Sequence, residues 1–305
     1  MNTFLSAQPP LANDHTTSSE VTPRMQPLTL VTQDGTRLGA KLFFATSQAK
    51  ANLIVSAATA VPQSHYKHFA VYAASKGFNV LTFDYRGIGE SLHGDVADID
   101  MSYLDWGRYD LAAAVETMSK ESLPLFVVGH SYGGHAMGML PNPEKIHGAY
   151  SFGSGAGWAG YMKPFEALKV RILWNLVLPP LVKWKGYMAW SLIGMGADMP
   201  YGVYRDWKRW CKNPRYFFDD PDYGYLKETY ARNRFPLIAA TATDDEWAPP
   251  ASRDAFCKHF INSKIKLLNL EPQPGKTLGH MGYFKKDAEP YWQAALQWFE
   301  GLMSA

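Results

Sequence analysis

Residues 124–140 constrain the fold of this 305-residue chain more than any other stretch. An apolar run, Leu125 to Val128, is followed at once by Gly129-His130-Ser131-Tyr132-Gly133 and then by the small residues of 134–140. The apolar run predicts a buried strand, and the residues from Gly134 to Leu140 predict a helix. The pattern G-x-S-x-G between a strand and a helix is typical of a sharp, strained turn that lifts the serine hydroxyl clear of a sheet. Strand and helix then pass so closely that Gly129 and Gly133 must be glycine.

The composition describes a globular chain with a sizeable core, because 47% of the residues are hydrophobic and 19% are charged. The net charge of +2 is too small to favour nucleic acid or an anionic membrane surface as a partner. Two cysteines, Cys211 and Cys257, give no disulfide framework and favour a reducing, cytoplasmic location. Residues 1–25 are rich in Ser, Thr, Pro and Asn and lack a secretory pattern, so we expect a disordered N-terminal tail.

The order of predicted elements indicates an α/β fold with a mostly parallel central sheet flanked by helices. Strands and helices alternate regularly up to residue 153 and again from residue 236. Between them lie prolines, helical stretches and six of the ten tryptophans, without a convincing strand. We therefore expect one core built from residues 26–153 and 236–305, with an inserted helical cap at 154–235.

A serine raised on such a turn needs a histidine as general base and a carboxylate that orients it. His280 lies between glycines in Leu278-Gly279-His280-Met281-Gly282, on a loop between the last predicted strand and helix. Asp244 and Asp245 follow the strand predicted at 236–241, so their loop should leave the same edge of the sheet. The spacing to Pro249 favours Asp245 over Asp244 as the acid. The predicted catalytic residues are therefore Ser131, Asp245 and His280.

With these residues in place, the chain resembles the α/β-hydrolase superfamily, and most closely a set of bacterial predicted hydrolases whose substrates are not settled. The resemblance spans most of residues 27–303 and is strongest at 84–91, 129–134, 244–249 and Gly279-His280. It implies a serine hydrolase without a cofactor. It also implies that backbone N–H groups of Thr59 and Tyr132 form the oxyanion hole, although the family's usual His-Gly is replaced here by Ala57-Ala58.

Three other patterns have simpler explanations. Asp84 and Arg86, at a strand end, are expected to brace loops. The G-x-G-x-x-G match at 155–160 lacks the following βαβ strand, so we do not expect dinucleotide binding. His65 and His68 share a helix face but no third ligand is visible, and no metal site is expected.

The most apolar stretch, residues 171–182, is too short to span a bilayer and contains Pro179-Pro180. It allows three interpretations: packing within the cap, contact with an acyl chain, or peripheral contact with a membrane.

The sequence thus predicts hydrolysis of carboxylic esters of small molecules with an apolar part, through an acyl-enzyme. An aminopeptidase or amidase, a thioesterase, a lactonase or an acyltransferase could use the same three residues. A non-catalytic ligand-binding protein on the same scaffold also remains open.

Overall fold

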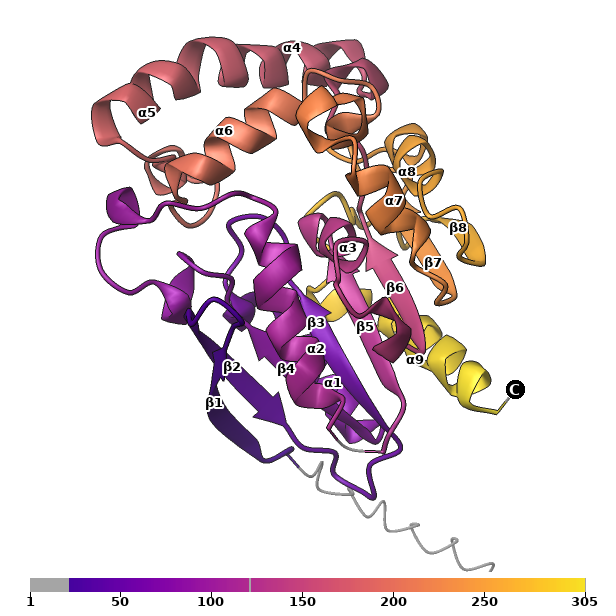
Figure 1. The fold of residues 1–305 in the computed structure, drawn as a ribbon. Helices are drawn as coiled ribbons and strands as arrows, with labels where there is room; N and C mark the ends of the chain where they lie inside the picture. The colour runs from indigo at the N-terminus through magenta and orange to yellow at the C-terminus, as the bar shows by residue number, and fades with distance from the viewer. Residues whose placement is uncertain (1–21, 121, 305) are drawn as a thin grey trace, which may run out of the picture.

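The computed structural model describes residues 22–304 apart from residue 121, and in this part of the chain one eight-stranded sheet organises the fold (Figure 1). The strand order is β1-β2-β4-β3-β5-β6-β7-β8. The strands are β1 Met25–Val31, β2 Arg37–Phe43, β3 Ala51–Ser56, β4 Phe78–Phe83, β5 Leu125–His130, β6 Gly148–Phe152, β7 Leu237–Ala242 and β8 Ile265–Leu270. Strand β2 is antiparallel to β1 and β4, and the other neighbouring pairs are parallel. The predicted α/β fold with a mostly parallel sheet is confirmed.

Helices cover both faces of the sheet, which explains why every residue of β3, β5, β6 and β7 is buried. On one face α1 (Lys67–Ser75) contacts α9 (Glu289–Met303), with the Phe69 and Trp292 rings 5.7 Å apart. On the other face lie α2 (Ala112–Met118), α3 (Tyr132–Met137) and α8 (Pro250–Cys257). Helix α3 begins at Tyr132, two residues before its expected start, so the serine directly precedes the first helical turn.

The N-terminal boundary of the fold lies earlier than expected. Strand β1 begins at Met25, within the predicted tail of residues 1–25, and the Arg24 carbonyl accepts a hydrogen bond of 2.9 Å from Phe44 N–H. The guanidinium of Arg24 also lies 3.8 Å from the centre of the Phe44 ring. Arg24 and Met25 were therefore wrongly assigned to the tail, because Arg24 pairs with Phe44 and Met25 pairs with Phe43 of β2. Residues 1–21 lie outside the described residues.

The segment between β6 and β7 contains four α-helices: α4 Pro164–Ile172, α5 Leu178–Lys185, α6 Tyr201–Trp210 and α7 Leu226–Ala231. Helices α4 and α5 join through a π-helical stretch, Leu173–Val177, and with α6 they form a layer beyond the carboxyl end of the sheet (Figure 1). Helix α7 instead packs on the core, where the Tyr230 hydroxyl donates a 2.6 Å hydrogen bond to the His135 carbonyl. The insertion expected at 154–235 therefore has two parts, of which only the first lies over the sheet edge.

Strand order places a crevice where the site was expected. From β3 the chain moves outward to β4 and then returns to β5 on the other side of β3. The loops that follow β3 and β5 lead to opposite sides of the sheet where the strand order reverses in this way. Ligand sites commonly form in the crevice between two such loops, at the carboxyl ends of the strands. Because Ser56 pairs with Gly129 at those ends, the loop that contains Thr59 and the turn that contains Ser131 leave the sheet side by side.

Candidate active site

Ser131 occupies a backbone conformation that side-chain-bearing residues rarely adopt, with φ 50° and ψ −112°. The turn is held by a 2.8 Å hydrogen bond from Ser131 N–H to the Phe152 carbonyl. It also requires glycine, because a Cβ at Gly133 would lie 2.0 Å from the Ser56 carbonyl oxygen and one at Gly129 would lie 2.6 Å from the Gly133 carbonyl carbon. The close strand–helix passage inferred from the sequence is therefore present, and it fixes the direction of the serine side chain.

The structure brings the three predicted catalytic side chains together in one hydrogen-bonded chain. The Ser131 hydroxyl lies 3.0 Å from Nε2 of His280, and Nδ1 of His280 lies 2.9 Å from Oδ2 of Asp245. These residues follow β5, β8 and β7, three strands whose carboxyl ends lie at the same edge of the sheet. The hydroxyl, the imidazole and the carboxylate lie in this order in space. The imidazole can therefore remove the hydroxyl proton as a general base, with the carboxylate orienting the ring.

The Asp245 carboxylate has no exposed side-chain surface, and protein donors surround it. Oδ1 accepts hydrogen bonds from Trp247 N–H at 3.0 Å and Ala248 N–H at 2.8 Å. Oδ2 accepts one from the Tyr283 hydroxyl at 2.7 Å, and that hydroxyl itself accepts one from a backbone N–H of β7 at 2.9 Å. Burial alone would raise the pKa of Asp245, but the facing His280 ring and these donors hold that pKa below its usual value.

Asp244, the alternative acid, does not contact His280. Its two oxygens accept 2.9 Å hydrogen bonds from Leu278 N–H and Gly279 N–H. The two neighbouring aspartates therefore have different contacts. Asp245 faces the imidazole, and Asp244 holds the backbone of the loop that contains His280. The sequence did not reveal this second task, nor the role of Tyr283, because both depend on where the loop after β8 lies.

The oxyanion-hole residues inferred from the family resemblance lie on the two loops that flank the crevice. No hydrogen bond from Thr59 N–H or Tyr132 N–H is found within the described residues, so both donors can serve a ligand. Thr59 lies in a turn closed by a 3.2 Å bond from Val61 N–H to the Ala58 carbonyl. The next residue, Ala60, has a φ of 61°, and its carbonyl accepts a 2.9 Å hydrogen bond from Ala197 of the insertion.

A buried relay links this turn to the histidine loop. Ala58 N–H donates to the Tyr66 hydroxyl at 2.7 Å, and that hydroxyl lies 3.0 Å from Nδ1 of His130. Nε2 of His130 lies 2.8 Å from the His280 carbonyl oxygen. The two ends of the relay require His130 to accept at Nδ1 and donate at Nε2, which is a neutral ring. Burial lowers the pKa of His130 to about 3, which agrees with that state.

An apolar cavity of about 160 Å³ opens at Ser131 and His280. Most of its wall consists of large apolar side chains from the insertion and the neighbouring loops: Trp190, Met195, Trp207, Trp247 and Met281. Thr59 completes the lining on the side of the crevice. No carboxylate or ammonium group is found among the lining residues that the structure describes.

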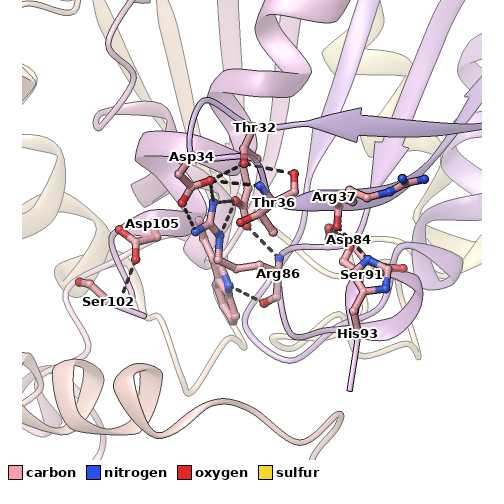
Figure 2. Close-up of polar contacts among 12 residues, drawn as sticks. Thr32, Asp34, Thr36, Arg37, Asp84, Arg86, Ser91, His93, Ser102 and Asp105 are labelled. Carbon is pink, nitrogen blue, oxygen red and sulfur yellow. Dashed lines mark hydrogen bonds and ion pairs between the residues drawn. The ribbon is translucent and has the colours of Figure 1, made fainter. Parts of the chain in front are cut away.

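Asp84 and Arg86 act on neighbouring loops, as expected. The Arg86 guanidinium is bound by Asp110 at 2.7 Å and Asp34 at 2.6 Å, and Figure 2 shows it directed at Asp34. Asp84 accepts hydrogen bonds from Gln63 N–H at 2.6 Å and from a second backbone N–H in the loop after β4. These bonds join the loop after β3, which contains Thr59, to the loop after β4.

The glycine motif at 155–160 serves close packing in this structure. A Cβ at Gly155 would lie 2.4 Å from the Ser252 hydroxyl oxygen, and one at Gly157 would lie 2.8 Å from the Cys211 sulfur. The helical turn that follows, Ala159–Tyr161, has only three residues. His65, which was expected to share a helix face with His68, packs near His130, with 6.4 Å between the ring centres.

Comparisons with known proteins agree with this architecture. The model of the alpha/beta hydrolase family matches residues 54–275, which include Ser131 and Asp245 and end before His280. A soluble variant of monoglyceride lipase from Saccharomyces cerevisiae is similar, with a TM-score of 0.63 at 16% identity over 96% of this chain and 99% of that one. An esterase of Pyrococcus furiosus has a TM-score of 0.61 at 13% identity over 99% of this chain and 100% of that one.

At these identities the solved structures establish the fold alone. A comparison with curated proteins gives no match. The family model, in contrast, covers more than half of the sequence and supports hydrolase activity. Sheet order, strand–turn–helix geometry and the family match lead to one conclusion: the chain belongs to the alpha/beta hydrolase family.

Proposed function

We propose that the protein is a serine hydrolase that cleaves carboxylic esters with a small apolar acyl or alcohol group, through an acyl-enzyme on Ser131. The observation that carries this proposal is the 3.0 Å contact between the Ser131 hydroxyl and His280 Nε2, with Asp245 behind the imidazole and an apolar cavity in front.

In the first half of the reaction His280 takes the Ser131 proton while the serine oxygen attacks the ester carbonyl carbon. Negative charge then develops on the carbonyl oxygen, and the N–H groups of Thr59 and Tyr132 stabilise it. One such donor contributes about 3 kcal/mol to the transition state. His280 next protonates the leaving alcohol, and Asp245 stabilises the imidazolium between these steps.

In the second half, water enters where the alcohol has left, and His280 removes its proton as it attacks the acyl carbon. The serine alkoxide leaves and regains a proton from the imidazole, which releases the carboxylic acid. We propose that the insertion acts as a cap in both steps, because Trp190 and Trp207 line the cavity and exclude bulk water from the ester.

The size and polarity of the cavity favour esters over the alternatives that bind a charged amine. An apolar cavity of about 150 Å³ holds a benzene-sized group, which is comparable with the 160 Å³ at Ser131. An aminopeptidase needs a carboxylate for the substrate ammonium, but none of the described residues that line the cavity has one, and most acidic side chains of the insertion have partners elsewhere. Asp206 holds Ser102 and Tyr103, for example, and Asp220 pairs with Arg209.

The test is a panel of p-nitrophenyl esters with acyl chains of increasing length, together with acyl thioesters and aminoacyl anilides. We expect turnover of the short esters, labelling of the protein by a fluorophosphonate, and loss of both in Ser131→Ala. The control is Cys257→Ser, which changes a buried side chain that does not line the cavity. This variant should keep both the ester turnover and the fluorophosphonate labelling. Undiminished turnover or labelling in Ser131→Ala would overturn the proposal, and faster cleavage of anilides than of esters would replace it by an aminopeptidase.

A further inference from the structure

The long helical unit at the outer edge of the insertion is apolar on two faces. Its inward face carries buried side chains at spacings of three or four residues, namely Ala167, Val170, Trp174, Leu178 and Val182. Its outward face carries a second apolar series, Phe165, Leu168, Ile172, Leu176 and Trp184, and all of these side chains are exposed. A helix that is apolar on both sides is normally buried on both sides, in a protein core or in lipid.

The outward series is large for a surface helix. Leu176 is 69% exposed and Trp184 is 73% exposed, and α4 and α5 form the outermost layer of the molecule, with no other part of the described chain beyond them (Figure 1). Contiguous exposed apolar patches of this kind mark interaction surfaces. The surface is a convex helix rather than a groove, so it fits a flat, deformable partner better than a protruding one. No helix in the described chain has the length and apolar character to cross a bilayer, which leaves binding parallel to a surface.

The charges beside this face identify the partner. Residues 163–185 contain five Lys or Arg residues and one Glu. Lys163 pairs with Glu246 and Lys169 pairs with Glu166, both within 4 Å. The remaining cations, Arg171, Lys183 and Lys185, have no carboxylate partner within the described residues, and the Lys185 ammonium lies 4.3 Å from the Trp184 ring centre.

We propose that the outward face of α4 and α5, defined by Phe165, Leu168, Ile172, Leu176 and Trp184, docks on an anionic lipid bilayer. Apolar side chains enter the boundary between headgroups and acyl chains, and the flanking cations pair with anionic headgroups. A second copy of the chain fits less well, because two such faces would bring their unpaired cations together. The local charge decides this partner, although the small net charge of the whole chain did not suggest it.

The docking face lies close to the cavity. Trp174, on the inward side of the same helical unit, packs against Trp207 with 5.1 Å between the ring centres, and Trp207 lines the cavity at Ser131. Two side chains, Trp174 and Trp207, therefore connect the lipid-facing helical unit to the ester site. Docking itself does not depend on the proposed esterase activity, and it can be measured in a protein that lacks the serine nucleophile.

The experiment is flotation of full-length Ser131→Ala protein with vesicles of phosphatidylcholine and phosphatidylglycerol at 70:30, compared with pure phosphatidylcholine. Each of the three unpaired cations should tighten binding about fivefold, so anionic vesicles should bind about 100-fold more tightly at low salt. Adding Leu168→Glu and Leu176→Glu should weaken binding by at least about tenfold, because two apolar side chains no longer enter the lipid.

The control is Ile261→Glu, which places one glutamate on a side chain as exposed as that of Leu176, 70% against 69%, in the loop between α8 and β8. It should bind vesicles like the parent. In a background with Ser131 intact, the Leu168→Glu/Leu176→Glu protein should also keep its turnover of a soluble ester, which shows that it is folded. The proposal is overturned if the protein binds both vesicle types with equal affinity, or if Ile261→Glu weakens vesicle binding as much as the two glutamates do. It is also overturned if light scattering shows that the parent is a dimer and that Leu168→Glu/Leu176→Glu is a monomer.

Discussion

Asparagine at position 245 is the most informative substitution in the site, because each carboxylate oxygen of Asp245 has its own donors. Oδ1 accepts from the backbone N–H groups of Trp247 and Ala248 and lies 3.1 Å from His280 Nδ1. Oδ2 accepts from Tyr283 and lies closer to that nitrogen, at 2.9 Å. An asparagine has only one acceptor oxygen. The backbone donors cannot move, so the amide oxygen must take their side, and the NH₂ group then points at the imidazole.

That arrangement favours the wrong tautomer of the ring, because the NH₂ group takes the position closer to Nδ1. Nδ1 of His280 must accept from the amide, so its proton moves to Nε2, the atom 3.0 Å from the Ser131 hydroxyl. A protonated Nε2 cannot act as a general base. In sites of this type the wrong tautomer lowers kcat by about 10⁴, which corresponds to about 5 kcal/mol of transition-state stabilisation.

The assay is steady-state hydrolysis of p-nitrophenyl butyrate by Asp245→Asn, with fluorophosphonate labelling and thermal unfolding measured on the same sample. Asp244→Asn is the control, because it alters a neighbouring carboxylate that holds only the backbone of the histidine loop. We expect the control to lose less than about tenfold in kcat, since one charge-assisted hydrogen bond contributes about 1.5–3 kcal/mol and acts mainly on loop stability. A loss in the control that equals the loss in Asp245→Asn would refute this assignment of the two aspartates.

Three further outcomes can be checked on the same protein. Gly133→Ala should lower the free energy of unfolding by about 3 kcal/mol and abolish turnover, because its Cβ would lie 2.0 Å from the Ser56 carbonyl oxygen. Gly301→Ala is the control, since no atom lies within 4 Å of its added Cβ, and it should be neutral or stabilising in the same urea denaturation. Burial lowers the pKa of His135 to about 3, so its contribution to stability is present above pH ~6.5 and is lost as the pH falls toward the folded-state value. Between pH 6.5 and 4.5 the parent should therefore lose about 2 kcal/mol more than His135→Gln in urea titrations, and parallel losses would contradict the neutral buried ring. Tyr283→Phe removes one donor to the orienting carboxylate and should reduce kcat about three- to tenfold with KM unchanged, a result that unchanged kcat would exclude.

Much of the fold could be predicted because its signals are local in the sequence. The strand predicted at 125–128 extends only two residues further, to His130, and the strand predicted at 236–241 lies one residue later, at Leu237–Ala242. Short continuous apolar runs between turn residues favour strands buried on both faces, and their alternation with helices indicates a mostly parallel sheet. Helix α3 was less well predicted, because its first turn consists of the motif residues themselves, from Tyr132 on.

Partners of the serine could be named from the sequence because the fold fixes which loops share one edge. A residue just after β7 and a residue after β8 must lie beside the turn after β5 once the strands are parallel neighbours. Strand order identifies loops rather than atoms. The spacing to Pro249 favoured Asp245 over Asp244 but could not assign a task to the other aspartate.

The sequence by itself therefore determined the class of the sheet, the pinched serine turn and the set of loops around it, since each of these follows from the chemistry of residues next to one another in the chain. Only the tertiary structure decided how the two aspartates divide their tasks, that Tyr66 and His130 connect the turn at Thr59 to the histidine loop, and that the outer helix is apolar on two sides. These features depend on the direction in which each loop and helix face points, and packing between segments far apart in the sequence sets that direction.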